Sequence, residues 1–125
     1  SNVRDWLHVS DHADALLTVL SSGKNGETYL IGGDSERTNL SLVREICCIL
    51  DELKPSKNGS YNRHVAFVRD RLGHDKRYAI DATKIEDELG WKSKIDLASG
   101  LRSTVKWYIE NEDWWLPILN TIKCF

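Results

Sequence analysis

The most regular pattern in this sequence is an apolar repeat with helical spacing between residues 39 and 53. A helix is expected to open at Thr38 or Asn39, and Lys54-Pro55 ends the pattern. The apolar positions recur at intervals of three and four residues, at Leu42, Ile46, Ile49, Leu50 and Leu53. A helix with one apolar stripe is stable only when that stripe packs against another element. The rest of the chain must therefore supply the partners.

Strand-like and helical runs alternate along the remaining sequence. Strands are predicted over residues 4–9, 28–31 and 64–68. Further helices are predicted from Ser10 or Asp11 to residue 22, over 83–89 behind Asp81, and over 97–108 behind Asp96. This order predicts an α/β fold, a small mixed lobe with a short sheet, βαβ packing and about four helices.

The end of the chain suggests that this fold is not self-sufficient. The segment from Trp114 onward is apolar and receives no assignment from its pattern. Three short strands and a tryptophan-rich end would leave apolar surface uncovered. We therefore expect the chain to be one domain, residues 1–125, of a larger protein.

Length, charge and composition exclude several classes of protein. A chain of 125 residues is too short for a cofactor domain and a substrate domain together. The net charge of -2 gives no overall attraction for nucleic acid. No apolar run or leader points to a membrane or to export, which favours the cytoplasm. Cys47, Cys48 and Cys124 lack zinc spacing and are expected to be reduced, with Cys47 or Cys48 in the core.

A basic stretch between residues 61 and 77 is the first candidate site. Its cations are Arg63, Arg69, Arg71, Lys76 and Arg77, which outnumber its two aspartates. The planar guanidinium group suits phosphate because it donates two parallel hydrogen bonds. Gly73 lets the backbone approach an anion closely, and His74 can add a donor. The alternative is a solvated loop whose arginines and aspartates pair with each other.

Two residues outside this stretch could also meet an anion. Asn39 lies at a helix start, where backbone donors favour negative charge, although Asn is also a common helix cap. Arg4 heads the first predicted strand, and its alternative is a surface ion pair with Asp5.

The motifs of catalysis and cofactor binding are missing from the sequence. No G-x-G-x-x-G follows a strand, no tyrosine is followed four residues later by lysine, and no nucleophile elbow occurs. We assign no catalytic, cofactor-binding or metal-binding residue. The residues alone predict an α/β domain with a candidate phosphate site.

Several motifs in one order give the sequence a family resemblance. The segments that carry it are residues 4–13 (RDWLHVSDHA), 26–33 (GETYLIGG), 70–81 (DRLGHDKRYAID), 89–92 (LGWK) and 104–108 (TVKWY). Together they resemble the dTDP-glucose 4,6-dehydratases of the extended short-chain dehydrogenase/reductase superfamily. The resemblance runs from Val3 to about Trp115, and several linked motifs are far more specific than one.

The resemblance implies a division of labour in a longer enzyme. In that family an amino-terminal Rossmann domain holds NAD and the catalytic tyrosine and lysine, whereas the carboxy-terminal part binds the nucleotide sugar. The reaction oxidises the sugar at C4, eliminates water across C5 and C6, and returns the hydride to C6. This chain corresponds to the carboxy-terminal part, so it is expected to be inactive alone. The full-length enzyme is expected to be a homodimer.

The resemblance also assigns substrate-binding residues. Arg4, Asn39, Arg71 and His74 match the positions that hold the nucleoside diphosphate of a dTDP-glucose-like substrate. Departures from the family pattern occur at His8 (Tyr in the family), Ser10 (Glu), Leu30 (Asn) and Leu72 (Pro), and they put the exact substrate in question. Two alternatives stay open: the lobe of a related nucleotide-sugar epimerase or decarboxylase, and a stand-alone nucleotide-sugar-binding module.

Overall fold

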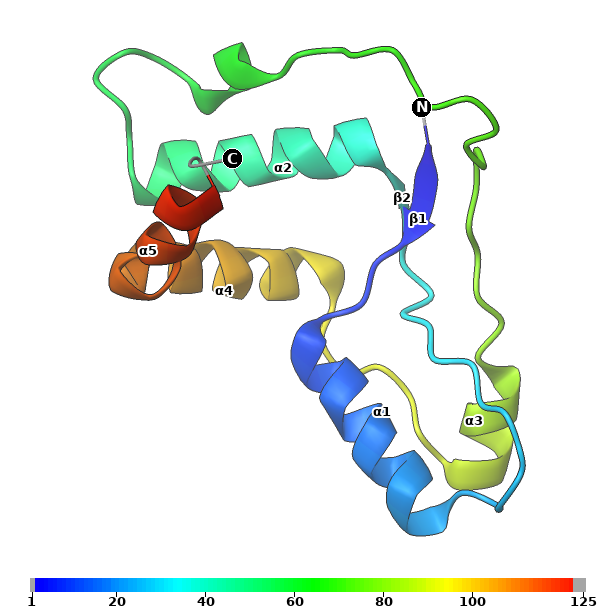
Figure 1. Ribbon diagram of the computed structural model, residues 1–125. Helices are drawn as coiled ribbons and strands as arrows, with labels where there is room; N and C mark the ends of the chain where they lie inside the picture. Colours follow the sequence, from blue (N-terminus) through cyan, green and yellow to red (C-terminus); the bar gives the residue numbers. More distant parts are fainter. Residues whose placement is uncertain (1, 123–125) are drawn as a thin grey trace.

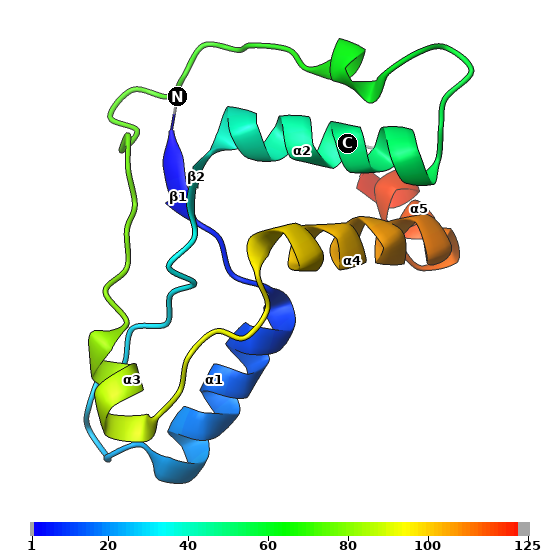
Figure 2. The ribbon, with the colours of Figure 1, turned by 180° about the vertical axis from the view of Figure 1, so that it is seen from behind.

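The computed structural model describes residues 2–122 and confirms the mixed α/β fold class. Its elements are β1 (Val3–Asp5), α1 (Val9–Ser22), β2 (Glu36–Thr38), α2 (Asn39–Leu53), the 3₁₀ helix η1 (Tyr61–His64), α3 (Thr83–Leu89), α4 (Leu97–Glu110) and α5 (Glu112–Ile122). Figure 1 and Figure 2 show two groups of helices joined by the short sheet, with α2 and α4 in one group and α1 and α3 in the other.

The sheet is antiparallel, so the predicted βαβ packing is wrong for the described part of the chain. The register pairs Val3 with Thr38, Arg4 with Arg37 and Asp5 with Glu36. On its other edge, β1 forms an isolated parallel bridge between Val3 and Arg77. The N–H of Val3 donates to the Lys76 carbonyl at 2.8 Å, and the N–H of Tyr78 donates to the Val3 carbonyl at 3.1 Å. The loop before α3 is thereby held beside β1.

The predicted strand over residues 4–9 forms only at its start, because β1 ends at Asp5 and α1 begins at Val9.

The predicted strand over residues 28–31 is wrong. The segment has no strand partner, although its side chains alternate as they would in a strand. Tyr29 and Ile31 pack against the core between α1 and α3, whereas Leu30 is exposed. The alternation thus reflects packing against helices and not pairing in a ladder. The second strand of the sheet, β2, begins five residues later and is short and polar.

The predicted strand over residues 64–68 is also wrong. His64 ends η1, and the residues after it have no regular structure. Phe67 and Val68 are largely exposed. A β-rich run needs a neighbouring edge to pair with, and none reaches this segment in the described structure.

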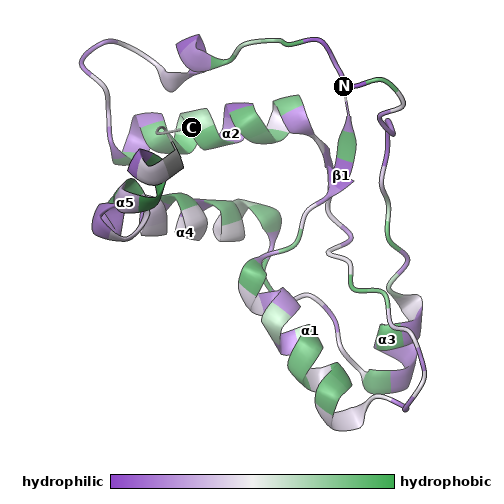
Figure 3. Cartoon of the chain, viewed as in Figure 1, coloured by the Kyte–Doolittle hydropathy of each residue, from purple (hydrophilic) through white to green (hydrophobic). Residues whose placement is uncertain are grey.

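One buried cluster lies between α1 and α3. Ala15 of α1, Ile85 of α3 and Trp91 behind α3 form it, and Ile85 is fully buried with 0% exposure. Figure 3 shows apolar residues along both helices. The outer side of α1 is also apolar, and Leu20 is 84% exposed there. The expectation of uncovered apolar surface is therefore confirmed.

A second contact joins α2 and α4. The apolar stripe of α2 is buried at Leu42, Cys47 and Ile49, and α4 contributes Val105 and Gly100. Gly100 lets the His8 ring and the Ile95 side chain pack closely against α4, because a Cβ at this position would lie 3.1 Å from both. The prediction that one of the two adjacent cysteines lies in the core is confirmed for Cys47, whose burial raises the pKa of its thiol. Cys124 lies outside the described residues.

Two of the predicted helix ends are confirmed. The carboxylate of Asp96 accepts the Ser99 N–H at 3.0 Å and caps α4. Gly90 ends α3 with φ 67°, a left-handed conformation that glycine adopts at little cost. The predicted cap of α3 is wrong, because Ala82 takes the cap position; Asp81 lies one residue earlier, and its carboxylate accepts the Thr83 N–H at 3.0 Å.

The predicted cap of α1 is wrong. His8 takes that position, and its Nδ1 accepts the Ser10 N–H at 3.2 Å. Asp11 is instead a buried carboxylate that accepts the N–H groups of Lys94 at 3.1 Å and Ile95 at 2.9 Å. Asp11 therefore joins α1 to the segment that leads into α4, which is a long-range contact that the local sequence pattern does not contain.

The part of the Trp114 segment that the structure describes, residues 114–122, lies in α5, and residues 123–125 lie outside the described residues. The Trp114 ring meets the Trp107 ring of α4 with centroids 5.2 Å apart and planes at 71°, an edge-on arrangement. The indole N–H of Trp115 donates to the Tyr108 carbonyl at 2.8 Å. These contacts hold α5 against the end of α4.

Candidate functional site

The loop between η1 and α3 brings three of the four predicted residues together. Arg4 lies on β1, whereas Arg71 and His74 lie on the loop that the bridge at Val3 holds beside that strand. Nη2 of Arg4 is 2.8 Å from Nε2 of His74, and Nη2 of Arg71 is 3.0 Å from the same nitrogen. The two guanidinium groups therefore converge on one atom.

The contacts of His74 fix the position of its ring proton. Arginine can only donate hydrogen bonds, so Nε2 of His74 is the acceptor. Nδ1 is 2.6 Å from Oδ1 of Asp70 and 3.0 Å from Nδ2 of Asn2. The ionised carboxylate can only accept, and its contact is the shorter one, so the ring proton lies on Nδ1 and is donated to Asp70. His74 is half-buried, whereas Asp70 and Arg71 are exposed.

Asp70 belongs to this cluster, and sequence reasoning missed it because it treated Asp70 only as a negative charge of the basic stretch. Its Oδ1 also accepts the Arg71 N–H at 2.8 Å, and its Oδ2 accepts from the Asn2 side chain at 3.1 Å. The hydrogen bond from His74, followed by those from Asn2 and the Arg71 N–H, lowers the pKa of the Asp70 carboxyl to about 2. The signal available in the sequence was the glycine at position 73, which adopts φ 71° in a turn between Asp70 and His74.

Arg4 is held by an aromatic ring as well as by hydrogen bonds. Its guanidinium carbon lies 4.2 Å from the centre of the Tyr78 ring. It also donates to the carbonyls of Val3 at 2.6 Å and Asp75 at 3.2 Å. The Tyr78 hydroxyl donates to Asp75 Oδ2 at 2.7 Å, and this contact raises the pKa of Tyr78. Tyr78 is a second residue that the sequence reasoning missed.

The alternative of an ion pair between Arg4 and Asp5 is wrong. The Asp5 carboxylate accepts two backbone N–H groups, from Gly33 and Ser35, each at 2.8 Å. Asp5 thus holds β1 against the turn before β2 and does not pair with Arg4.

Asn39 is near this cluster but does not join it. The N-terminal cap of α2 is Thr38, whose hydroxyl accepts the Ser41 N–H at 3.1 Å, so Asn39 is the first residue of the helix and not its cap. The Asn39 N–H donates to the Asn2 carbonyl at 2.9 Å, and the Asn2 side chain contacts both Asp70 and His74. Asn39 is thus linked to His74 only through Asn2, and the Asn39 side chain is exposed.

The alternative of a loop with mutually paired charges holds for only part of the basic stretch. Arg77 binds the Glu36 carboxylate through two nitrogens, at 2.7 and 2.5 Å. Arg63 donates to backbone carbonyls of its own loop. Within residues 2–122, by contrast, neither Arg4 nor Arg71 has a carboxylate within ion-pair distance. Two guanidinium groups thus meet without an anionic partner.

The departure at Leu72 falls on an open position. Its side chain is 93% exposed, next to the Gly73 turn. Leu72 therefore contributes no packing that would hold the loop.

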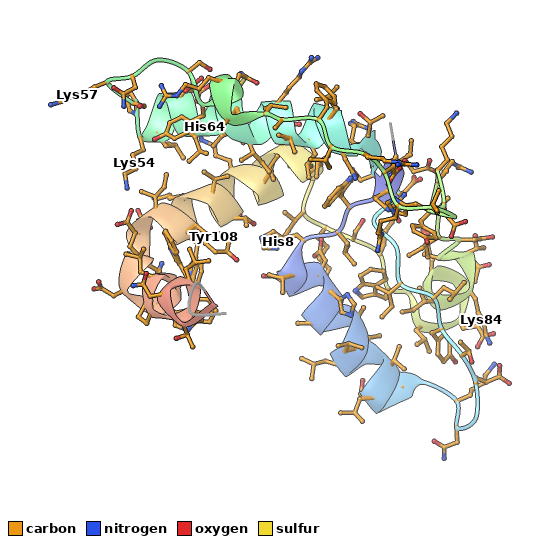
Figure 4. The ribbon with its side chains drawn as sticks, turned by 45° about the horizontal axis from the view of Figure 1, so that its top comes forward. His8, Lys54, Lys57, His64, Lys84 and Tyr108 are labelled. Atoms are coloured by element: carbon orange, nitrogen blue, oxygen red, sulfur yellow. The ribbon has the colours of Figure 1, made fainter. Side chains whose placement is uncertain are left out.

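A concave region lies between the start of α1 and α4. This cavity of about 680 Å³ is lined mainly by apolar atoms, with Leu7, His8, Trp107 and Tyr108 among its walls. Figure 4 shows His8 and Tyr108 on its two sides. No arginine or lysine lines it. The cavity lacks the cationic donors that a diphosphate needs.

The described part of the chain offers neither a metal centre nor a membrane span. Over residues 2–122, no three side chains of His, Cys, Asp or Glu are placed to hold a metal ion. No helix in the same range is long and apolar enough to cross a bilayer.

Comparison with known proteins shows the family to which the chain belongs. The family described as GDP-mannose 4,6 dehydratase matches residues 1–104, most of the chain. The chain belongs to this family. Its resemblance to the dTDP-glucose 4,6-dehydratases is also confirmed, because a probable dTDP-glucose 4,6-dehydratase of Sinorhizobium fredii is 50% identical over 122 residues. That match covers 98% of the chain and 35% of the relative, so the chain spans about a third of the length of the curated relatives it matches.

Solved structures show the same similarity. The dTDP-glucose 4,6-dehydratase of Bacillus anthracis, in complex with NAD, matches with a TM-score of 0.78 and 45% identity over 93% of this chain and 34% of that one. DesIV, a dTDP-glucose 4,6-dehydratase of Streptomyces venezuelae with NAD and TYD bound, matches with a TM-score of 0.76 and 44% identity over the same shares.

Proposed function

We propose that this chain forms the nucleotide-sugar-binding part of a dTDP-glucose 4,6-dehydratase. Arg4 and Arg71 contact the diphosphate of the substrate, and His74 and Asn39 add further donors. The observation that carries the proposal is the convergence of the Arg4 and Arg71 guanidinium groups on His74 Nε2, at 2.8 and 3.0 Å, without a carboxylate partner.

The chemistry of the cluster suits a diphosphate. Such a group carries about two negative charges, and its binding requires charge-assisted donors from several directions. Arg4 approaches from β1, Arg71 and His74 from the loop, and Asn39 from the start of α2. Each arginine is expected to contribute about 1.5–3 kcal/mol of binding free energy as a hydrogen bond to a charged group.

The redox part of the reaction is assigned to residues outside this chain. The sequence has no glycine-rich turn of the type that holds a dinucleotide, so its residues do not fit NAD. NAD, the catalytic tyrosine and the catalytic lysine belong to the Rossmann domain of a longer, homodimeric, cytoplasmic enzyme. The chain alone is accordingly inactive. When bound in that enzyme, NAD accepts and returns the hydride.

Calorimetric titration of dTDP into the 125-residue chain tests the proposal. We expect weak binding by the wild type, because this chain carries only part of the pocket, and none by Arg71→Ala. Arg102→Ala is the matched control, because Arg102 is an exposed arginine of α4 that pairs with Glu52. Equal binding by the wild type and Arg71→Ala would count against the site.

Two experiments on the longer protein separate the remaining alternatives. Turnover assays distinguish a dehydratase from an epimerase or a decarboxylase that uses the same lobe. The coding sequence upstream distinguishes an enzyme from a stand-alone module: an open frame with a glycine-rich turn and Y-x-x-x-K supports the enzyme, and a start codon near Ser1 supports the module.

A further inference from the structure

We propose that Asp70 is a positioning residue that lets His74 bind the diphosphate as an imidazolium, so that binding of the nucleotide sugar takes up a proton. This inference rests on the proposed function of the same site and adds a regulation by pH to it. The proton comes from solvent and returns there on release, and no covalent bond changes.

The first step is the state of the site without ligand. Two donors, Nη2 of Arg4 and Nη2 of Arg71, point to Nε2 of His74 at 2.8 and 3.0 Å. Nε2 therefore carries a lone pair, and the ring is the neutral tautomer with its proton on Nδ1. Histidine thus serves as an internal acceptor for both arginines.

The second step is the arrival of the diphosphate. Its oxygens are charged acceptors and replace Nε2 as partners of Arg4 and Arg71, because a guanidinium group is attracted more strongly to an anionic oxygen than to a neutral imidazole nitrogen. The Nε2 lone pair of His74 then faces phosphate oxygens. This contact is repulsive unless Nε2 gains a proton.

The third step concerns how Nε2 gains that proton. A shift of the proton from Nδ1 to Nε2 would leave a bare Nδ1 at 2.6 Å from the Asp70 carboxylate, so lone pairs would face each other. Protonation of both nitrogens avoids this repulsion and gives each a negatively charged partner. Asp70 therefore excludes the neutral alternative and favours the imidazolium.

The charges around His74 agree with this sequence of steps. From β1 the ring meets Arg4, and from the loop it meets Asp70 and Arg71. The nearby Asp75 carboxylate accepts from the Tyr78 hydroxyl, and Glu36 of β2 is held by Arg77. The Asn2 amide and Asn39 at the start of α2 are uncharged. An imidazolium without ligand would adjoin two guanidinium groups, and a diphosphate reverses that balance.

The Asp70 carboxyl is ionised throughout the relevant range. Its hydrogen bonds from His74, Asn2 and the Arg71 N–H hold its pKa at about 2. Asn2 and the Arg71 N–H also fix the carboxylate toward the ring, at 3.1 and 2.8 Å.

Nitrogen NMR of the His74 ring tests the state without ligand. At neutral pH the wild type is expected to show the tautomer protonated on Nδ1, which is the less common one for free histidine. Addition of dTDP-glucose is expected to shift both ring nitrogens to imidazolium values. A free chain with its proton on Nε2, or a ring that stays neutral with ligand bound, overturns the inference.

Calorimetry in buffers with different ionisation enthalpies measures the proton itself. The probe is dTDP-glucose, because its diphosphate is esterified at both ends and does not titrate near neutral pH. We expect proton uptake approaching one per ligand, and an affinity that falls by up to tenfold per pH unit as pH rises. Asp70→Asn keeps the acceptor oxygen but removes the charge, so uptake is expected to fall toward zero.

Asp87→Asn is the matched control, since it removes the same charge from the exposed surface of α3. It is expected to behave as the wild type does. Binding with the same heat in every buffer would overturn the inference and leave the proposed function standing. Absence of binding by a folded chain would instead count against the proposed function itself.

Discussion

The polar cluster around His74 and the apolar cluster around Ile85 are built on opposite principles. Ala15, Ile85 and Trp91 are buried and contact each other mainly through packing. The residues around His74 are exposed or half-buried and are linked by hydrogen bonds between β1 and a loop about 70 residues away in sequence. The apolar cluster stabilises the fold, whereas the polar cluster is proposed to hold donors in place for a ligand. Substitutions in the apolar cluster should therefore change the free energy of unfolding, and substitutions in the polar cluster should change the affinity for dTDP.

The largest expected effect is on the fold. Ile85→Ala removes a fully buried side chain from the α1–α3 cluster and should lower the free energy of unfolding by about 2–5 kcal/mol. Chemical denaturation measures this loss. Leu72→Ala is the control, because its side chain is 93% exposed and its removal should change stability little. Equal loss in the two variants would contradict the assignment of the core.

The next effect falls on binding and should leave the fold intact. Arg4→Ala removes one converging guanidinium group and should weaken dTDP binding by about 1.5–3 kcal/mol, roughly ten- to more than a hundredfold. Calorimetry gives the affinity, and circular dichroism checks the fold. If Arg4→Ala destabilised the chain as strongly as Ile85→Ala does, the contrast between the two clusters would fail.

Asp11 tests a polar contact that serves the fold. Its buried carboxylate accepts the N–H groups of Lys94 and Ile95, so Asp11→Ala leaves two backbone donors without that acceptor. The expected loss of stability is about 1–3 kcal/mol, with dTDP affinity unchanged. The control is Asp14→Ala, because Asp14 forms an exposed ion pair with Lys94. Chemical denaturation of both variants measures the difference in their free energies of unfolding. A larger loss in Asp14→Ala would contradict it.

The smallest effect is the acid dependence of the His74–Asp70 contact. The folded pKa of Asp70 is lowered to about 2 by its hydrogen bond from His74. A lowered pKa means that the ionised group stabilises the fold above its unfolded value of about 4, and that this contribution is lost as pH falls toward 2. Asp70→Asn should thus be slightly less stable than the wild type at pH 5, and the difference should shrink at lower pH. A constant difference would contradict the contact.

Local signals predicted the helices well because helix formation depends on nearby residues. The apolar repeat of α2, the cap at Asp96 and the stop at Gly90 are each contained within a few residues of sequence. Strands depend on partners elsewhere in the chain. The β-rich runs at 28–31 and 64–68 found no partner, whereas the polar residues of β2 paired with β1.

Only part of the candidate site could be predicted, because its contacts also join residues that are far apart in the sequence. Arg4, Asn39, Arg71 and His74 came from the family resemblance, and composition alone pointed only to the basic loop. Asp70 and Tyr78 were missed because their roles arise from contacts with the loop and with β1 that only the folded chain creates. Asn39 was placed at a helix start, but its cap role belongs to Thr38.

A crystal structure of the chain with dTDP bound tests the central claim most directly. We expect diphosphate oxygens within hydrogen-bond distance of both the Arg4 and Arg71 guanidinium groups, with the His74 ring beside them. A diphosphate bound elsewhere, for instance in the apolar cavity beside His8 and Tyr108, would contradict the account.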